Sequence, residues 1–150
     1  MLVSEMLTAG LVNCNLESSC KEELFEEMVQ MFVREGLVTD RKAAVDALLE
    51  REAKMSTGIS DGIALPHGKV DGIDGAIVAI GISKDGVDYD SLDGEPVQVV
   101  VMILCEKGRP AMHVELLSEV SRLLTIPGFK ERLLAANDSQ EIIEVIKSEE

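Results

Sequence analysis

Apolar residues follow two patterns along the chain, and these patterns separate the expected helices from the expected strands. Spacings of three and four residues predict helices, the first ending at Gly36 and the second running from Thr39 or Asp40 to about Arg51–Glu52. A third is expected from Pro110 to the Pro127–Gly128 pair, a short fourth over residues 129–136, and a last one after Asp138 that includes Ile142 to Ile146. Two continuous apolar runs, residues 76–82 and 97–104, are rich in β-branched side chains and are bounded by turn residues. Such runs are typical of strands that are buried on both faces.

Polar residues mark where several of these helices begin. Ser19 with Glu22, and Asp138 with Glu141, have the spacing of capping boxes, in which two side chains satisfy the first free amide groups of a helix. Pro110 suits the first turn of the helix that follows it, because its missing N–H has no partner there in any case.

The remaining segments complete the expected fold. Residues 2–12 are apolar with little periodicity and predict one strand with its approach, whereas residues 56–75 are rich in glycine and favour a loop or short strands. A chain of 150 residues suffices for one domain with one core. We therefore expect an α/β fold, a single-domain sandwich over residues 1–150 with a central mixed β-sheet and helices on both faces.

Composition and charge narrow the function classes. The chain has 14 Lys and Arg against 28 Asp and Glu, which gives a net charge of −14 at pH 7. Such a chain repels phosphate backbones and anionic lipids, and only 3% of it is aromatic. We therefore expect neither nucleic acid nor a membrane surface as a partner. The acidic charge serves either solubility or complementarity to a basic partner.

Cysteine usage and the N-terminal sequence predict a soluble cytoplasmic protein. Cys14, Cys20 and Cys105 are an odd number without a C-x-x-C pair, so we expect neither disulfides nor a zinc ribbon. Glu5 interrupts the first apolar stretch and no basic region precedes it, which argues against a signal peptide. The chain has no run of 18 apolar residues, so we expect no membrane insertion.

The two histidines are the main candidates for chemistry, and the first of them is His67. It follows Pro66, which restricts the backbone, and precedes Gly68, whose missing Cβ leaves room for a partner to approach. An imidazole held in this way suits a group that another molecule must reach. The alternative is a loop histidine that is satisfied by local hydrogen bonds.

His113 is the fourth residue of the helix that Pro110 begins, and it shares a stripe with Leu117, Val120 and Leu124. We therefore expect it to point inward at the positive end of the helix, where the imidazolium is disfavoured and anions are attracted. A neutral imidazole can donate one hydrogen bond to a phosphoryl oxygen there. The alternative is a buried histidine that is capped by the backbone.

Other catalytic patterns are weaker. The histidines lack metal-ligand spacing, and the sequence has neither a nucleotide-binding glycine loop nor a G-x-S-x-G elbow, so we expect no metal and no cofactor. A dispersed Ser-His-Asp arrangement stays open. We interpret His67 as a nucleophile, because a neutral imidazole nitrogen can accept a phosphoryl group directly.

Six blocks of sequence resemble one known family. They are ERE at 50–52, STGI at 56–59, GIALPHGK at 62–69, AIG at 79–81, DYDSLDGEPV at 88–97 and HVELLSEVSRLL at 113–124. In this order they are similar to the IIA domain of the sugar phosphotransferase system, in the fructose–mannitol class that includes nitrogen-regulatory IIA proteins. The resemblance implies the mannitol-type IIA fold. The main departure is Leu65, where the family often has Ile or Val.

The resemblance also implies site residues and partners. His67 would accept phosphate from the phosphocarrier protein HPr or a paralogue and pass it to a cysteine on the IIB domain of a sugar permease, for fructose or mannitol uptake. His113 would hydrogen-bond the phosphoryl group, Arg51 would balance its charge, and Thr57 would supply a hydroxyl contact. Without the resemblance, Arg51 is a solvated cation at a helix end and Thr57 is an ordinary loop residue.

Two other functions are open. In a nitrogen-regulatory IIA protein, phosphate on His67 would switch binding to a transporter, kinase or transcription factor. A metal- or triad-dependent hydrolase is the third hypothesis. For the phosphocarrier we expect acidic residues to surround the His67 pocket without lining it, because a carboxylate beside the phosphoryl group opposes its transfer.

Overall fold

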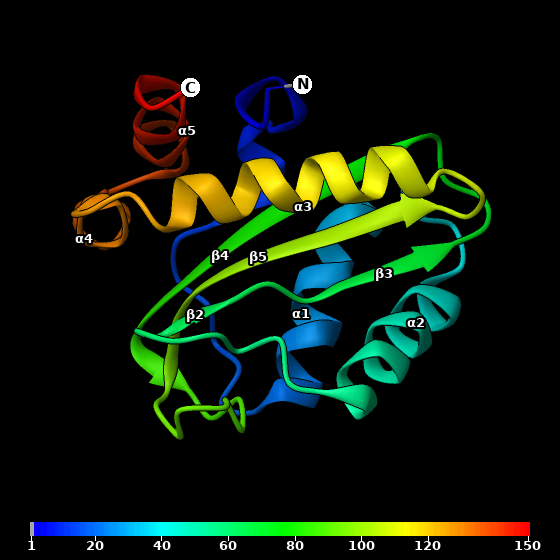
Figure 1. Ribbon diagram of the computed structural model, residues 1–150, viewed down its shortest axis with the longest axis horizontal. Coiled ribbons are helices and arrows are strands. Elements are labelled where there is room, and N and C mark those ends of the chain that lie inside the picture. The colour runs from blue at the N-terminus through cyan, green and yellow to red at the C-terminus, as the bar shows by residue number, and fades with distance from the viewer. Residues whose placement is uncertain (1) are drawn as a thin grey trace.

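The computed structural model describes residues 2–150, which form a mixed five-stranded sheet with helices packed on it (Figure 1). The strands are β1 (Val12–Asn13), β2 (Ile63–Ala64), β3 (His67–Val70), β4 (Ala76–Val87) and β5 (Val97–Glu106). Their order is β1-β4-β5-β2, and β3 also pairs with β5. The β4–β5 pair is antiparallel and the other pairs are parallel. The predicted α/β fold with a mixed sheet is therefore confirmed.

The helices are α1 (Lys21–Arg34), α2 (Arg41–Lys54), α3 (Pro110–Leu124), α4 (Phe129–Ala135) and α5 (Ser139–Ser148). Figure 1 shows α3 lying across one side of the sheet and α1 on the other, with α2 beside the edge strand β3. None of the helices within residues 2–150 combines the length and apolar content that crossing a membrane requires.

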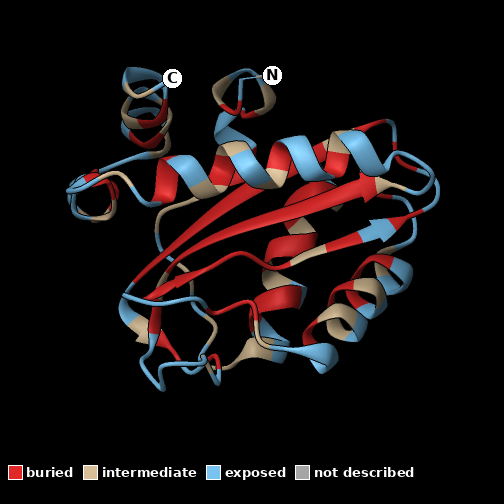
Figure 2. Ribbon diagram, in the orientation of Figure 1, coloured by how far each residue is buried: buried red, intermediate tan, exposed pale blue. Residues whose placement is uncertain are grey.

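Strands β4 and β5 form the centre of the core, as their continuous apolar sequences predict. Ten of their side chains are less than 1% exposed, and Figure 2 shows both strands buried along most of their length, whereas the outer face of α3 is exposed. These ten residues are Val78, Ala79, Val87, Val97, Val99, Val100, Met102, Ile103, Leu104 and Cys105. A strand that contacts helices on both faces has no polar side to present, which explains the unbroken apolar runs.

The start of the chain and the start of α1 differ from expectation. The strand expected within residues 2–12 is wrong for most of its length, since this segment forms two short 3₁₀ helices, Ser4–Met6 and Ala9–Leu11, before β1. Val3 and Leu7, which flank the first of these helices, and Leu11 at the end of the second are buried in the core.

The capping box expected at Ser19 is also wrong in its partner. The N-cap of α1 is Cys20, one residue later, and the amide and hydroxyl of Ser19 both donate to Glu23 Oε1 at 3.0 Å instead of pairing with Glu22. Asp138 caps α5 as predicted, because its carboxylate accepts a hydrogen bond of 2.8 Å from the amide of the third helical residue. The N-cap of α1 lies one residue later than predicted because Glu22 and Glu23 are adjacent in the first turn and either of them can pair with Ser19.

The strands β2 and β3 form one edge strand that is interrupted at Leu65 and Pro66. Ala64 pairs with Val100 and His67 with Ile103, so both strands keep the same register on β5. Proline has no N–H to donate to a neighbouring strand. It is tolerated in an edge strand at a position whose N–H would point away from the sheet. The interruption frees the Leu65 carbonyl from the sheet just before His67.

Gly68 packs against α2. A Cβ at Gly68 would lie 3.3 Å from the carbonyl carbon and oxygen of Ala47, so the expectation that Gly68 leaves room for a partner is wrong. The glycine instead permits a close approach of β3 to α2. Because Arg51 lies one helical turn after Ala47, this approach brings its side chain to His67.

Candidate functional site

The two histidines face each other where β3 lies between α2 and α3. Their ring centroids are 5.4 Å apart and the ring planes are tilted by 52°. His67 is the first residue of β3 and is half-buried, whereas His113 is the fourth residue of α3 and is buried, which confirms that it points inward. Two residues that are far apart in sequence therefore share one site.

The hydrogen bonds of His67 assign different roles to its two ring nitrogens. Nδ1 lies 2.8 Å from the Leu65 carbonyl oxygen, which can only accept, so Nδ1 carries the proton. Nε2 then holds the free lone pair, and it accepts a hydrogen bond of 3.3 Å from Nε of Arg51. The same guanidinium donates from Nη1 to the Met55 carbonyl at 2.8 Å. Nε2 is therefore the nucleophilic atom, with a cation beside it.

Both histidines are held in the neutral form. Burial lowers the pKa of His67, and the charges of Arg51 and Lys69 act in the same direction, against the opposing effects of the Leu65 carbonyl and Glu52. Burial also lowers the pKa of His113, with further contributions from His67 and Lys69. Nδ1 of His113 is buried without a hydrogen-bond partner among residues 2–150. Such a group favours a ligand that supplies the missing partner.

If His67 is the phosphate acceptor that the sequence resemblance implies, we expect acceptance to persist at pH values at which an ordinary histidine is mostly protonated. The reactive form is neutral, so a pKa below the ordinary value near 6.5 leaves more than half of the rings reactive at that pH. The acceptance rate should fall only as pH drops through the lowered pKa. ¹⁵N NMR titration of the rings and acceptance rates between about pH 5 and 8 test this.

The urea-unfolded chain provides the control for this titration, because its histidines should protonate at the ordinary pKa. Between the two pKa values the unfolded chain binds more protons than the folded one, so stability should also fall as pH decreases through this window. A folded-state midpoint for His67 at or above the ordinary value would contradict the prediction.

A cavity of about 710 Å³ opens beside the histidines and carries both signs of charge. Its basic lining residues are Arg51, Lys54, Lys69 and Lys107, and its acidic ones are Asp40, Asp46, Glu50 and Asp71. The expectation that acidic residues surround the pocket without lining it is therefore wrong. Helix α2 forms one wall of this cavity. Its charged residues Asp46, Glu50, Arg51 and Lys54 lie on the helix face that lines it.

Lys69 is a site residue that the sequence analysis missed. It lies two residues after His67 on β3, so both side chains project from the same face of the strand. Its charge lowers the pKa of both histidines, and no carboxylate within residues 2–150 lies within ion-pair distance of its ammonium group. The alternation of residues along a strand is the signal that identifies it.

Exposed apolar side chains adjoin the site. Met55, whose carbonyl holds Arg51, is 60% exposed, and Val114, which follows His113, is 62% exposed. Apolar side chains at an exposed rim are suited to contact with a protein partner.

Thr57 does not reach the cavity. It is buried, and its hydroxyl contacts Glu52 and lies 2.7 Å from the hydroxyl of Tyr89. Its carbonyl accepts a hydrogen bond of 3.0 Å from the Leu65 amide. Thr57 is thus linked to His67 through the backbone, and the structure does not bring its hydroxyl together with the histidines.

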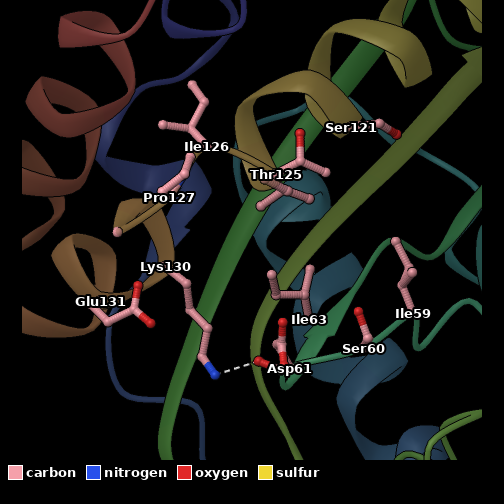
Figure 3. A pocket seen from close by; sticks show the side chains of 12 residues that line it. Ile59, Ser60, Asp61, Ile63, Ser121, Thr125, Ile126, Pro127, Lys130 and Glu131 are labelled. Atoms are coloured by element: carbon pink, nitrogen blue, oxygen red, sulfur yellow. Dashed lines mark hydrogen bonds between the residues drawn. The ribbon is translucent and has the colours of Figure 1, made fainter.

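A second cavity, of about 530 Å³, lies between the end of α3, the start of α4 and the turn at Asp61 (Figure 3). Hydroxyl groups of Ser60, Ser121 and Thr125 line it together with apolar side chains. Lys130 spans it and donates to the Asp61 carbonyl. Neither histidine lines this cavity. The hydrogen bond of Lys130 across it connects α4 to the turn at Asp61.

The histidine site is suited to a phosphoryl group. It combines a free Nε2, a second neutral imidazole, a guanidinium and an ammonium group around one space. Phosphoryl transfer depends chiefly on positioning the reacting atoms and on neutralising charge on the equatorial oxygens, and this set of groups supplies both. Within residues 2–150 no group of three or more His, Cys, Asp or Glu is arranged to hold a metal ion.

Comparisons with known proteins agree with this class of site. Residues 5–149 match the family model of the phosphoenolpyruvate-dependent sugar phosphotransferase system, EIIA 2. The chain is 42% identical, over 97% of its length, to the fructose-specific EIIABC component of Bacillus subtilis, but it spans only 23% of that protein. It is 35% identical to the fructose-specific EIIA component of Haloferax volcanii, covering 96% of this chain and 94% of that protein.

A solved structure supports the same relationship. The nitrogen regulatory protein IIA-Ntr from Neisseria meningitidis matches with a TM-score of 0.88 and 26% identity, over 96% of this chain and 98% of that one. The chain belongs to the EIIA 2 family of the sugar phosphotransferase system. It is a phosphotransferase component of the kind that carries a phosphohistidine.

Proposed function

We propose that His67 accepts a phosphoryl group from phosphorylated HPr, or a paralogue, and passes it to a cysteine on the IIB domain of a sugar permease. The observation that carries the proposal is the pair of hydrogen bonds on the ring, Nδ1 to the Leu65 carbonyl and Arg51 to Nε2. They leave Nε2 as the nucleophile at a site that a partner can reach. This transfer would take place in the cytoplasm.

In the transfer, the Nε2 lone pair of His67 forms the new N–P bond as the donor's N–P bond breaks, and that electron pair returns to the donor imidazole. The guanidinium of Arg51 occupies the lone pair beforehand, so it moves from Nε2 onto a phosphoryl oxygen. His113 donates to a second oxygen, and Lys69 neutralises part of the remaining charge.

Fructose is the sugar that the comparisons favour. The Bacillus subtilis relative at 42% identity and the Haloferax volcanii relative at 35% are both named as fructose-specific components. The Bacillus relative joins its EIIA part to B and C parts in one chain, which supports a IIB domain as the acceptor. Mannitol uptake is the nearest alternative within the same mechanism.

We expect radiolabelled phosphate to pass from HPr through this protein to a IIB domain. The protein is incubated with labelled phospho-HPr, separated from it, and then mixed with the IIB domain of a fructose permease or with the same domain lacking its cysteine. Label should move only to the intact IIB domain. Stable label on the IIA protein without onward transfer to any fructose or mannitol IIB domain would instead favour the nitrogen-regulatory function, which the likeness to the Neisseria protein keeps as the second candidate.

A further inference from the structure

A buried carboxylate lies next to the site but does not line its cavity. Glu52 follows Arg51 on α2 and is only 8% exposed. Its Oε1 accepts hydrogen bonds from the Thr57 amide at 2.9 Å and the Tyr89 hydroxyl at 3.0 Å, and its Oε2 lies 2.9 Å from the ammonium group of Lys21. Burying a charge is costly unless its partners replace the lost water, and here the amide and hydroxyl of Thr57, the Tyr89 hydroxyl and the Lys21 ammonium group do so.

The hydroxyl groups around Glu52 are fixed as donors. Tyr89 is fully buried, and burial together with the adjacent carboxylate raises the pKa of its hydroxyl far above the usual range. Tyr89 therefore stays protonated and donates to Glu52 at any physiological pH. Lys21 also lies over the Tyr89 ring, 4.7 Å from its centroid, which adds a cation–π contact to the cluster.

This cluster holds the base of a short hairpin that leads to His67. The hairpin turns at Asp61 and Gly62, both with positive φ, and the Leu65 amide returns to the Thr57 carbonyl at 3.0 Å. Gly58 of the hairpin packs closely on the segment that follows Tyr89, since a Cβ there would lie 2.4 Å from Ser91 Oγ. Lys130 holds the tip, as described above.

The hairpin ends at the carbonyl that selects the reactive nitrogen. The Leu65 amide is fixed by Thr57, and the carbonyl of the same residue accepts the Nδ1–H of His67 at 2.8 Å. A displacement of the hairpin would therefore weaken the contact that keeps the proton on Nδ1. The path from Glu52 to the ring contains two hydrogen bonds before Leu65, from the Thr57 amide and the Leu65 amide, and one after it, from Nδ1 of His67 to the Leu65 carbonyl.

We propose that Glu52 is a positioning residue, which anchors the hairpin so that the Leu65 carbonyl keeps the proton on Nδ1 of His67. The proposal rests on the proposed function, in which Nε2 is the phosphoryl acceptor. When Nε2 forms the N–P bond, the proton stays on Nδ1 and the ring becomes cationic. The Leu65 carbonyl and the nearby negative charge of Glu52 stabilise that cation, and the donor ring becomes neutral.

Other charges also act on the His67 ring, and the experiment must separate them from Glu52. The charged or titratable groups that act on it or share its site are Arg51 and Glu52 of α2, Lys69 of β3 and His113 of α3. Glu52 is the only carboxylate among these four, and its charge favours the protonated ring. Removing it should therefore lower the pKa of His67 while the other three groups stay in place.

The test compares Glu52→Gln and Tyr89→Phe with Glu27→Gln. In both site variants we expect the Nδ1–H tautomer of His67 to lose population in ¹⁵N NMR spectra, and the acceptance rate to fall at least about tenfold, because small displacements of reacting groups have large effects on rate. Only Glu52→Gln should also lower the pKa of His67. Glu27 is a matched control, since its carboxylate on α1 accepts amide hydrogen bonds from Glu17 and Ser18 away from the site.

Glu27→Gln should lower the thermal unfolding midpoint without changing the tautomer, the pKa or the rate. Wild-type tautomer and rate in both folded site variants would overturn the proposal, and Tyr89→Phe decides alone if Glu52→Gln does not fold. The NMR measurements need no phosphate donor. If the wild-type protein takes no phosphate while the two site variants show the expected tautomer shifts, the proposed function is refuted and the positioning role stands.

Discussion

Replacement of His67 by alanine is expected to abolish phosphate acceptance completely. The ring supplies Nε2, which accepts a hydrogen bond from Arg51 beside the cavity, and the alanine side chain has no atom that can form a bond to phosphorus in its place. Intact-mass spectrometry after incubation with phospho-HPr measures the result. The wild-type protein should gain the mass of one phosphoryl group, and His67→Ala should gain none.

The fold should survive this substitution. His67 is half-buried at the first position of an edge strand, and its backbone pairing with Ile103 does not involve the ring. We expect a thermal unfolding midpoint within a few degrees of wild type, which corresponds to about 1 kcal/mol or less. If a folded His67→Ala protein still took up label, the phosphate acceptor would be another residue, and His113 would be the first to test.

Replacement of His113 by alanine is expected to slow phosphate acceptance about 100-fold without abolishing it. Loss of one preorganised hydrogen-bond donor to a charge that develops in the transition state commonly has an effect of this size. The buried ring of His113 faces His67 at 5.4 Å between centroids and is neutral, so it can donate to the phosphoryl group without adding a charge. Rapid-quench measurement of label transfer from phospho-HPr gives the rate.

His113→Gln is the matched variant, because its amide keeps a donor at about the same distance from the backbone. It should recover part of the rate that His113→Ala loses. Val114→Ala changes the next residue, which is exposed, and separates the loss of the ring from a general disturbance of the first turn of α3. A wild-type rate in a folded His113→Ala protein would exclude His113 from the transfer step.

The helices and central strands could be predicted because each depends on local sequence. The start of α3 can be predicted from Pro110, and β4 and β5 can be predicted from their unbroken apolar runs. In each case the signal lies within a few residues of the element. The start of α1 could not be predicted to the residue, since Glu22 and Glu23 are equally suited to pair with Ser19. Which of them pairs depends on which helix face packs on the sheet, and that choice is made by the tertiary structure.

The two histidines of the site could be predicted from the sequence, whereas most of the residues around them could not. His67 and His113 were chosen from local features, the proline and the helix start, and both lie in one site. Gly68 was misread because a missing Cβ has the same sequence signal whether it admits a partner or, as here, an adjacent helix. The hairpin that turns at Asp61 and Gly62 was not predicted, since the glycine-rich segment 56–75 indicates only a loop or short strands. The burial of Glu52 was not predicted either, because it depends on Tyr89, which is distant in the chain.

The balanced lining of the histidine cavity bears on the energetics of the phosphorylated state. Four cationic and four anionic side chains leave the space without net charge before a phosphoryl group, with its charge of about −2, arrives. A purely basic cavity would stabilise the phosphorylated state so strongly that onward transfer of the phosphoryl group would be unfavourable. Here the carboxylates keep the phosphohistidine high in group-transfer potential, so the exchange with a donor histidine should have an equilibrium constant near unity. The direction of flow is then set by how fast the downstream acceptor is emptied.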